Sequence, residues 1–559
     1  MPFSLPSPPL SINFSTIPLL IASLLTYVVL CSALRYQRRD AKLKKYGFTD
    51  REAMRKMSNV EAQKIIAYLA ELEFPKLYFT SVQFALFKTY GIPTISGLLV
   101  ATREFSTPEN ASKRYADTGV LIQEFVGHHP KSPRVIKALA RMNYIHSRYQ
   151  KAGKISNSDL LYTLSVFITE PISWVERYEW RAMNDMEICA IGTFWKSIGD
   201  AMGIVYDGAL AKSEWEDGIA FYEDIKMWAE GYERDFMMAA TPNKITADEL
   251  IPLLLFYLPQ NFKAAGKHMV GVLMGERLRA AMMHPTPPAT YFQFVNAVFG
   301  MRRFFLRYLA LPRPEFMRVR ELSDTPDPKT GRYHTNRYQA HPFYNKPTFL
   351  SRWGPEGWFV WASGGDVPGS KGDLYIPEGY KFEEVGPKGM KNRGTEEMKT
   401  WEEKLEAERP AGCPFAFGQA ILTQALPSWS TLGFSETHIL AYLLHDIGTM
   451  DENITATLLS VEFYGWFLAL GRLKLHEAPI EQAENVAEVN VALGSAALTY
   501  RDVISSDLEK HTDTASPSRP QDLGGTGTLT RLGGLVQLAT VFDMASASDF
   551  NALPRFHVN

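Results

Sequence analysis

The sequence predicts a mainly α-helical protein with one membrane-spanning helix near its N-terminus. Apolar residues recur at helical spacing in several long segments, whereas the alternation typical of strands is scarce. One early stretch is uncharged and long enough to cross a bilayer. A chain of 559 residues is too long to fold around one compact core, so more than one domain is expected. The predicted helical segments are 59–73, 112–126, 131–149, 158–170, 183–205, 214–233 and 248–260.

The predicted membrane span is 14–34, which carries no charged side chain. Roughly 20 residues at a rise of 1.5 Å each cross the hydrocarbon core of a bilayer. A basic cluster follows the span, whereas residues 1–13 carry no charge, so the positive-inside rule predicts a single-pass anchor with a lumenal tail at 1–13 and a cytoplasmic body. A cleaved signal peptide would have its basic residues before the apolar core. The cluster is Arg35, Arg38, Arg39, Lys42, Lys44 and Lys45.

Composition excludes some classes of protein. Apolar residues make up 46% of the chain and charged residues 21%, with a formal net charge of −2, which gives no electrostatic basis for binding nucleic acid. Cys31, Cys189 and Cys413 are far apart in the sequence, which fits a reducing compartment.

Proline and glycine cluster in 310–395, which predicts an irregular section that wraps or caps the helices. The run at 294–311 reads either as a buried helix with arginines at its rim or as an interfacial helix dipping into lipid headgroups.

Polar residues interrupt two otherwise apolar helical segments. Arg114 and Thr118 are four residues apart, hence on one helix face, and Asp117 lies beside them. His146 is in the middle of the next predicted helix. A helical histidine is by itself more often structural than a ligand, and Glu187 is a candidate inward partner for Arg114. These residues alone leave a structural role and a ligand role open.

Three segments, in this order along the chain, resemble the ER-bound oxygenases of the mpaB type: KRYADTGVLIQEFV, YIHSRYQKAGKISNSDLLYTL and WVERYEWRAMNDMEICAIGTFWKSIGDAMGI. Those fungal enzymes act in meroterpenoid pathways and share a catalytic domain with the latex-clearing rubber oxygenases. The likeness runs from the anchor to about residue 415, so 50–415 is expected to form the catalytic domain. It also implies attachment to the endoplasmic reticulum membrane.

The resemblance implies a particular chemistry. In the rubber oxygenases, haem iron and O₂ attack an isoprenoid double bond and give carbonyl fragments. Haem b is therefore the expected cofactor, with His146 as the proximal ligand and with Arg114 and Thr118 on the distal side. A neutral imidazole donates a lone pair to iron, and a buried arginine suits O₂ or a haem propionate. Asp117 stands where those enzymes have a distal lysine, so it is counted as a candidate catalytic residue.

Residues 416–559 are similar instead to the HD-domain cyanamide hydratases. His445 and Asp446 match the adjacent His-Asp pair that gives a metal one nitrogen and one oxygen ligand, and Asp543 matches the downstream aspartate. The upstream histidine of that family is missing, and a polar stretch at 501–520 reads as an insertion. A partial HD-like domain with a doubtful divalent-metal site is therefore expected.

The leading functional prediction is a membrane-anchored, haem-dependent oxygenase. It would cleave or oxidise the isoprenoid side chain of a lipophilic terpenoid or meroterpenoid precursor, with O₂, a prenylated small molecule and membrane lipid as its partners. One alternative is an HD-type, metal-dependent hydratase or hydrolase that uses residues 1–415 as a scaffold. A non-catalytic membrane scaffold is the other. A Soret band that depends on His146 supports the first reading, and bound metal that depends on His445 and Asp446 supports the second.

Overall fold

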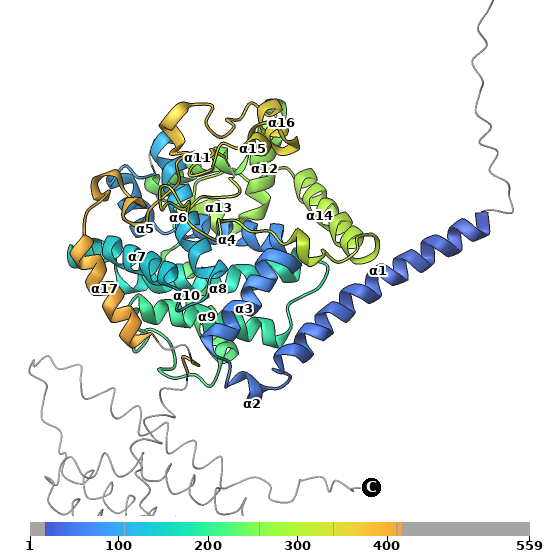
Figure 1. The fold of residues 1–559 in the computed structure, drawn as a ribbon, viewed down its shortest axis with the longest axis horizontal. Coiled ribbons are helices and arrows are strands. Elements are labelled where there is room, and N and C mark those ends of the chain that lie inside the picture. The colour runs from blue at the N-terminus through green and yellow to red at the C-terminus, as the bar shows by residue number, and fades with distance from the viewer. Residues whose placement is uncertain (1–16, 106, 257, 339, 410–411, 416–559) are drawn as a thin grey trace, which may run out of the picture. The chain divides into compact units, whose positions relative to one another are not determined.

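The computed structural model describes residues 17–105, 107–256, 258–338, 340–409 and 412–415 (Figure 1). Helices dominate this part of the chain, which confirms the predicted fold class. Its β-structure consists of isolated bridges that join Leu322 to Thr335, Tyr333 to Tyr380, and Thr335 to Asn345.

The N-terminal helix α1 (Ile17–Tyr46) extends well beyond the predicted end of the span at residue 34. It is the one unbroken helix among the described residues that is long and apolar enough to cross a membrane. Its first half is exposed, whereas Arg35 is only 5% exposed. Arg35 Nε and Nη2 donate to the carbonyls of Ala310 and Leu311, at 2.9 and 3.2 Å. Part of the basic cluster therefore fastens α1 to the body.

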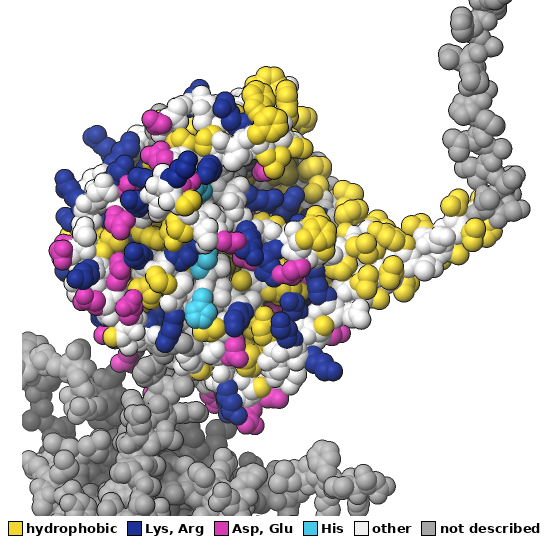
Figure 2. Space-filling view, viewed as in Figure 1, with side chains coloured by type: hydrophobic (Ala, Val, Ile, Leu, Met, Phe, Trp, Pro, Cys, Tyr) yellow, Lys and Arg dark blue, Asp and Glu magenta, His cyan; other side chains and the backbone are white. Residues whose placement is uncertain are grey.

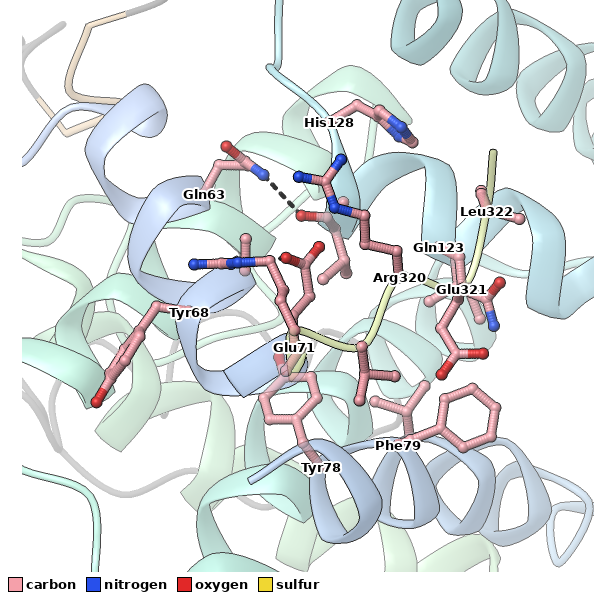
Figure 3. A pocket seen from close by; sticks show the side chains of 18 of the residues that line it. Gln63, Tyr68, Glu71, Tyr78, Phe79, Gln123, His128, Arg320, Glu321 and Leu322 are labelled. Atoms are coloured by element: carbon pink, nitrogen blue, oxygen red, sulfur yellow. Dashed lines mark hydrogen bonds and ion pairs between the residues drawn. The ribbon is translucent and has the colours of Figure 1, made fainter. Parts of the chain in front are cut away.

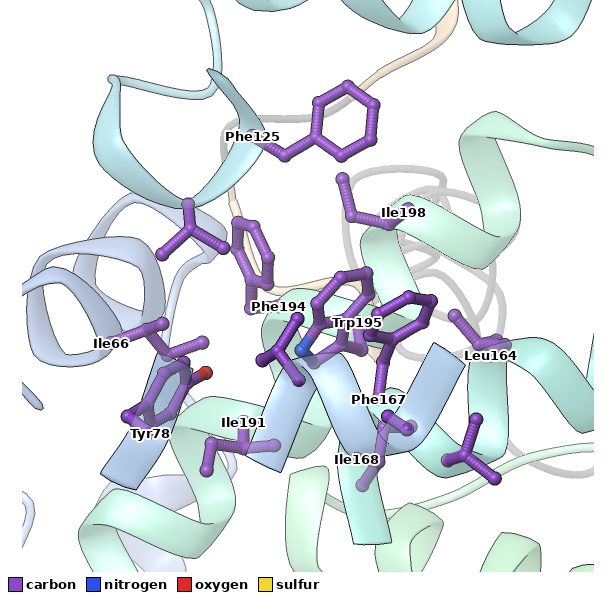
Figure 4. Packing of buried hydrophobic residues seen from close by; sticks show 14 of the residues in the cluster. Ile66, Tyr78, Phe125, Leu164, Phe167, Ile168, Ile191, Phe194, Trp195 and Ile198 are labelled. Atoms are coloured by element: carbon purple, nitrogen blue, oxygen red, sulfur yellow. The ribbon is translucent and has the colours of Figure 1, made fainter. Parts of the chain in front are cut away.

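The core of the body is formed by long helices that pack on one another. α4 (Pro75–Thr89) packs on α8 (Asn157–Tyr178), and α9 (Asp185–Ala201) packs between α3 (Asn59–Tyr68) and α10 (Gly218–Phe236). Figure 4 shows the centre of this core, where Phe167 stacks on Trp195 with ring centroids 4.7 Å apart. Aromatic side chains bury about 150–250 Å² each, so such pairs dominate the packing energy.

Local sequence signals explain where these core helices begin. Ser156 and Asp159 form a capping box at the start of α8, and Asn184 and Glu187 form another at the start of α9. Each box satisfies backbone N–H groups that have no partner within the helix. The two helices that carry the predicted site residues, α6 (Pro108–Gly127) and α7 (Pro133–Lys151), start on a proline instead, which suits the first helical position.

The two helix boundaries that differ most from the predictions both involve a proline. α8 passes through Pro171 to Tyr178, whereas the sequence predicts an end at 170. Buried neighbours such as Ile172 and Trp174 supply packing that offsets the lost hydrogen bond. α11 (Thr241–Leu254) begins earlier than the predicted 248, because Pro242 in the first turn favours a start that apolar periodicity does not register.

The section 310–395 is irregular, as predicted, and contains only short helices such as α15 (Phe349–Trp353) and α16 (Pro355–Ala362).

Before this section, α14 (Ala289–Phe304) continues into one π-helical turn, η4 (Phe305–Leu309). Val295 is the only buried residue of α14, so the buried-helix alternative for 294–311 is wrong. The remaining helices include α2 (Arg51–Met54), η2 (Leu69–Glu73), α5 (Pro93–Ala101), α12 (Lys263–Leu273), α13 (Gly275–Ala281) and α17 (Thr395–Glu408).

Candidate functional site

The predicted site residues of α6 and α7 line one internal cavity of about 210 Å³. Arg114, Asp117 and Thr118 come from α6, and His146 comes from α7, which packs beside it. Much of the remaining lining is apolar and includes Leu160, Leu164, Phe167 and Trp195. The fold thus brings three residues from neighbouring turns of α6 together with His146 of α7 and places them beside apolar side chains.

His146 is held in a neutral form. Its Nδ1 atom is buried and has no hydrogen-bond partner among the described residues. Burial, aided by the nearby Arg114 cation, lowers the pKa of His146 from its ordinary value of 6.5 to about 4. A neutral imidazole with an unpartnered nitrogen is the form that binds a metal. An unpartnered buried polar atom also costs free energy, so it marks a place where a ligand would be stabilising.

Arg114 makes no ion pair within the described ranges. Glu187, the candidate partner, binds Arg181 instead through two hydrogen bonds of 2.7 and 2.8 Å. Glu104 also lines the cavity, where burial raises the pKa of its carboxyl against the lowering effect of Arg114. The Arg114 guanidinium therefore remains available to an anionic group of a ligand, for which bidentate arginine is well suited.

Thr118 and Asp117 differ in how far their oxygens are engaged. Thr118 Oγ1 donates to the Arg114 carbonyl at 2.9 Å, which leaves its lone pairs free to accept. The Asp117 carboxylate is buried and accepts three hydrogen bonds: from Lys113 Nζ at 2.6 Å, from Tyr344 Oη at 2.6 Å and from the Gly386 backbone at 3.0 Å. This geometry favours a positioning role for Asp117 over proton transfer.

The segment at Gly386 and Pro387 closes one side of the cavity and was not among the predicted site residues. Gly386 has φ +110°, and a Cβ there would lie 2.6 Å from Cδ1 of Ile145, so only glycine fits. The fully buried Arg141 holds the surrounding loop by donating to the carbonyls of Val385, Met390 and Arg393. The Gly-Pro pair signals a turn, but nothing local reveals that Arg141 faces inward.

A second cavity, of about 690 Å³, is larger than the first, and Figure 3 shows part of its lining. Leu86 and Ile122 line both, so these two side chains form part of the wall between them. Lys42 and Lys45 of α1 line the larger cavity too. Its residues come from α1, α3, α4, α6 and the irregular section, and no sequence motif links them.

Sequence comparison with named proteins shows which family this chain belongs to. This chain is 42% identical over 400 residues to a protein of Penicillium brevicompactum named ER-bound oxygenase mpaB', a match covering 71% of this chain and 94% of the relative. A second protein of the same organism, named ER-bound oxygenase mpaB, is 40% identical over 377 residues, covering 67% and 90%. The chain belongs to the ER-bound oxygenase mpaB family. A Penicillium roqueforti mpaB is 43% identical over 276 residues, covering 48% and 93%.

Membership of the mpaB family confirms the resemblance and makes the protein an oxygenase, whose substrates are O₂ and a small molecule. No family model matches the chain. A cyanamide hydratase of Saccharomyces cerevisiae is 31% identical over 129 residues, which cover 23% of this chain and 45% of that relative.

The predicted HD-like metal site lies outside the described residues. His445, Asp446 and Asp543 all fall in 416–559, so their role stays a prediction, as does the insertion at 501–520. Within the described ranges, no group of three or more His, Cys, Asp or Glu side chains is arranged to hold a metal ion.

The low pKa of His146 predicts a particular pH dependence of stability. Between about pH 6.5 and 4 the unfolded state binds a proton at this residue that the folded state does not, so the free energy of unfolding falls as the pH falls through this window. Above pH 6.5 His146 is neutral in both the folded and the unfolded state, so it adds nothing to the pH dependence of the free energy of unfolding. We expect thermal unfolding of His146→Gln to depend less steeply on pH than that of the wild type between pH 4 and 6.5. Equal slopes would contradict the lowered pKa.

Proposed function

We propose that this protein is a haem-dependent oxygenase, anchored to the endoplasmic reticulum membrane by α1, that oxidatively cleaves or oxidises the isoprenoid side chain of a lipophilic terpenoid or meroterpenoid precursor. The observation that carries the proposal is His146, a neutral imidazole whose buried Nδ1 has no hydrogen-bond partner among the described residues and which lines a mainly apolar cavity together with Arg114. The names of the relatives support the oxygenase class and the membrane.

The residues of the cavity fit a haem. His146 would supply a nitrogen ligand to the iron, and Arg114 would pair with a propionate. Apolar side chains such as Leu160, Leu164 and Phe167 suit the faces of a macrocycle. At about 210 Å³ the cavity is smaller than the roughly 300–1,000 Å³ typical of drug-sized ligands, so binding requires its wall to move. Leu86 and Ile122 are the side chains whose displacement would join it to the larger cavity.

When bound, the haem iron supplies the activation of O₂ that protein side chains cannot provide. Cleavage of one alkene by one O₂ gives two carbonyl groups, so atoms and electrons balance without an external reductant. The protein's share is to hold the alkene and O₂ together and to exclude water. Arg114 and Thr118 face the cavity with a cation and a hydroxyl, which can orient polar atoms of the reactants. Asp117, through Gly386, keeps the cavity closed on one side.

An absorption spectrum with a pyridine-haemochrome assay tests the proposal. The full chain is expressed under haem-replete conditions, solubilised in detergent and purified. We expect a Soret band, about one haem per chain, and conversion of a prenylated test compound to a carbonyl product that depends on O₂. A protein that is folded by circular dichroism but contains no haem would overturn the proposed mechanism while leaving membership of the family intact.

A further inference from the structure

Exposed apolar side chains gather on one side of the body, over α14, η4, α15 and α16, and we call this surface the apolar face. Figure 2 shows it as a hydrophobic band that runs from α16 past α14 towards α1. Soluble monomers rarely expose a continuous apolar patch larger than a few hundred Å². Its members include Phe294, Met301, Phe304, Phe305, Trp358 and Trp361, all more than half exposed.

Two of the three arginines on α14 and η4 bind the body, and the third, Arg307, lies 5.8 Å from the ring centroid of Tyr36 on α1. The two elements contain no acidic residue. Arg302 donates to the Tyr178 carbonyl at 3.1 Å and to Glu179 Oε1 at 2.7 Å, and Arg303 donates to the Arg177 carbonyl at 3.1 Å. Because the guanidinium groups bind the body, the phenylalanines are left facing outward. Such an arrangement is typical of a helix that lies in a membrane interface.

Contacts with α1 fix the depth of this surface. Tyr27 Oη donates to the Leu309 carbonyl at 3.0 Å, and Arg35 binds the two carbonyls that follow. Tyr27 precedes Arg35 by eight residues, or about 12 Å of helix rise. If α1 crosses the membrane up to its first arginine, Leu309 lies between the levels of Tyr27 and Arg35, just below the membrane surface. The turn η4 and the end of α14 must then lie there too.

We propose that the apolar face is seated in the headgroup and upper acyl layer of the same membrane that α1 spans, so that its occupant is the bilayer itself. The inference rests on the membrane anchor in the proposed function. The aromatic members favour lipid, since Trp and Tyr concentrate at membrane interfaces. Arg38 reinforces the attachment by binding Glu73 and the Arg313 carbonyl, so α1 holds the body in one orientation.

This orientation places the larger cavity close to the lipid. Lys42, which lines that cavity, follows Arg35 by seven residues, or about 10 Å along α1. A lipophilic substrate with an anionic or polar head could therefore pass from the interface to the cavity with little exposure to water. Its head would meet Lys42 and Lys45 first.

Fluorescent labels at three equally exposed positions test the proposal. Leu24 on α1, Phe304 on α14 and Val205 after α9 are each 58% exposed. Val205 exchanges two hydrogen bonds with Asn157 at the start of α8, whereas Phe299 of α14 packs on Tyr178 at its other end, about 30 Å away. An environment-sensitive probe is attached to Leu24→Cys, Phe304→Cys or Val205→Cys in a full chain that carries Cys413→Ser. Cys31 and Cys189 are buried and stay in place.

Each variant is reconstituted into phosphatidylcholine vesicles with or without nitroxide-labelled lipid. We expect quenching at Phe304→Cys to approach that at Leu24→Cys and to exceed that at Val205→Cys several-fold. Quenching at Leu24→Cys alone would overturn the inference while supporting the anchor. If the Phe304→Cys probe reports an apolar environment but lipid nitroxides do not quench it, protein covers the face, and the inference fails. Quenching at none of the three would overturn the anchor and, with it, this inference.

Discussion

His146→Ala should remove the Soret band and lower oxygenase activity by more than about 100-fold, since even outer partners of a metal ligand contribute 10–100-fold. Among the described residues that line the cavity, His146 is the only histidine, so the lining offers no substitute imidazole nitrogen. The variant should still fold. Because His146 Nδ1 makes no hydrogen bond, its removal breaks none at that atom.

Haem content, activity and thermal unfolding are compared with His129→Ala, a matched variant of an exposed histidine outside the cavity. Added imidazole should restore part of the Soret band in His146→Ala, because the truncated side chain leaves room for the free ligand. A structural role alone would not produce this rescue. Full haem content in His146→Ala would exclude this residue as the axial ligand.

Asp117→Ala should lower the free energy of unfolding by about 3–5 kcal/mol, as expected when one partner of a buried ion pair is removed. The alanine would leave Lys113 Nζ, Tyr344 Oη and the Gly386 N–H without their acceptor. Lys113 would keep only its contact with the Gly386 carbonyl, at 3.1 Å. The loop that closes the cavity would loosen at the same time. Chemical denaturation followed by circular dichroism measures the loss.

Two variants separate positioning from proton transfer at this residue. Tyr344→Phe removes one of the three hydrogen bonds and should cost about 1.5–3 kcal/mol, the range for bonds to charged groups. Combined with Asp117→Ala, it should show strong non-additivity, because both changes break the same contact. If Asp117→Asn keeps the stability and haem content of the wild type but abolishes turnover, the carboxylate acts in the chemistry, and the sequence-based prediction of a catalytic Asp117 would be correct.

Sequence patterns alone determined the helical class, the apolar segment of α1 and most helix positions. These features depend on periodicity within a few turns, on local caps and on the length of an uncharged run. Resemblance added the family and the candidate residues. The same local periodicity put Arg114 and Thr118 on one face of α6, where the structure has them.

Only the tertiary structure decided what these side chains meet. Asp117 accepts hydrogen bonds from Tyr344 and Gly386, more than 200 positions away, and the Glu187 carboxylate binds Arg181, not Arg114. The outward face of α14 and the docking of Arg35 were likewise decided by distant segments. The physical reason is that burial and pairing depend on contacts between elements far apart in the chain. Periodicity shows which face of a helix is apolar, but whether protein or lipid covers that face depends on what lies beside it.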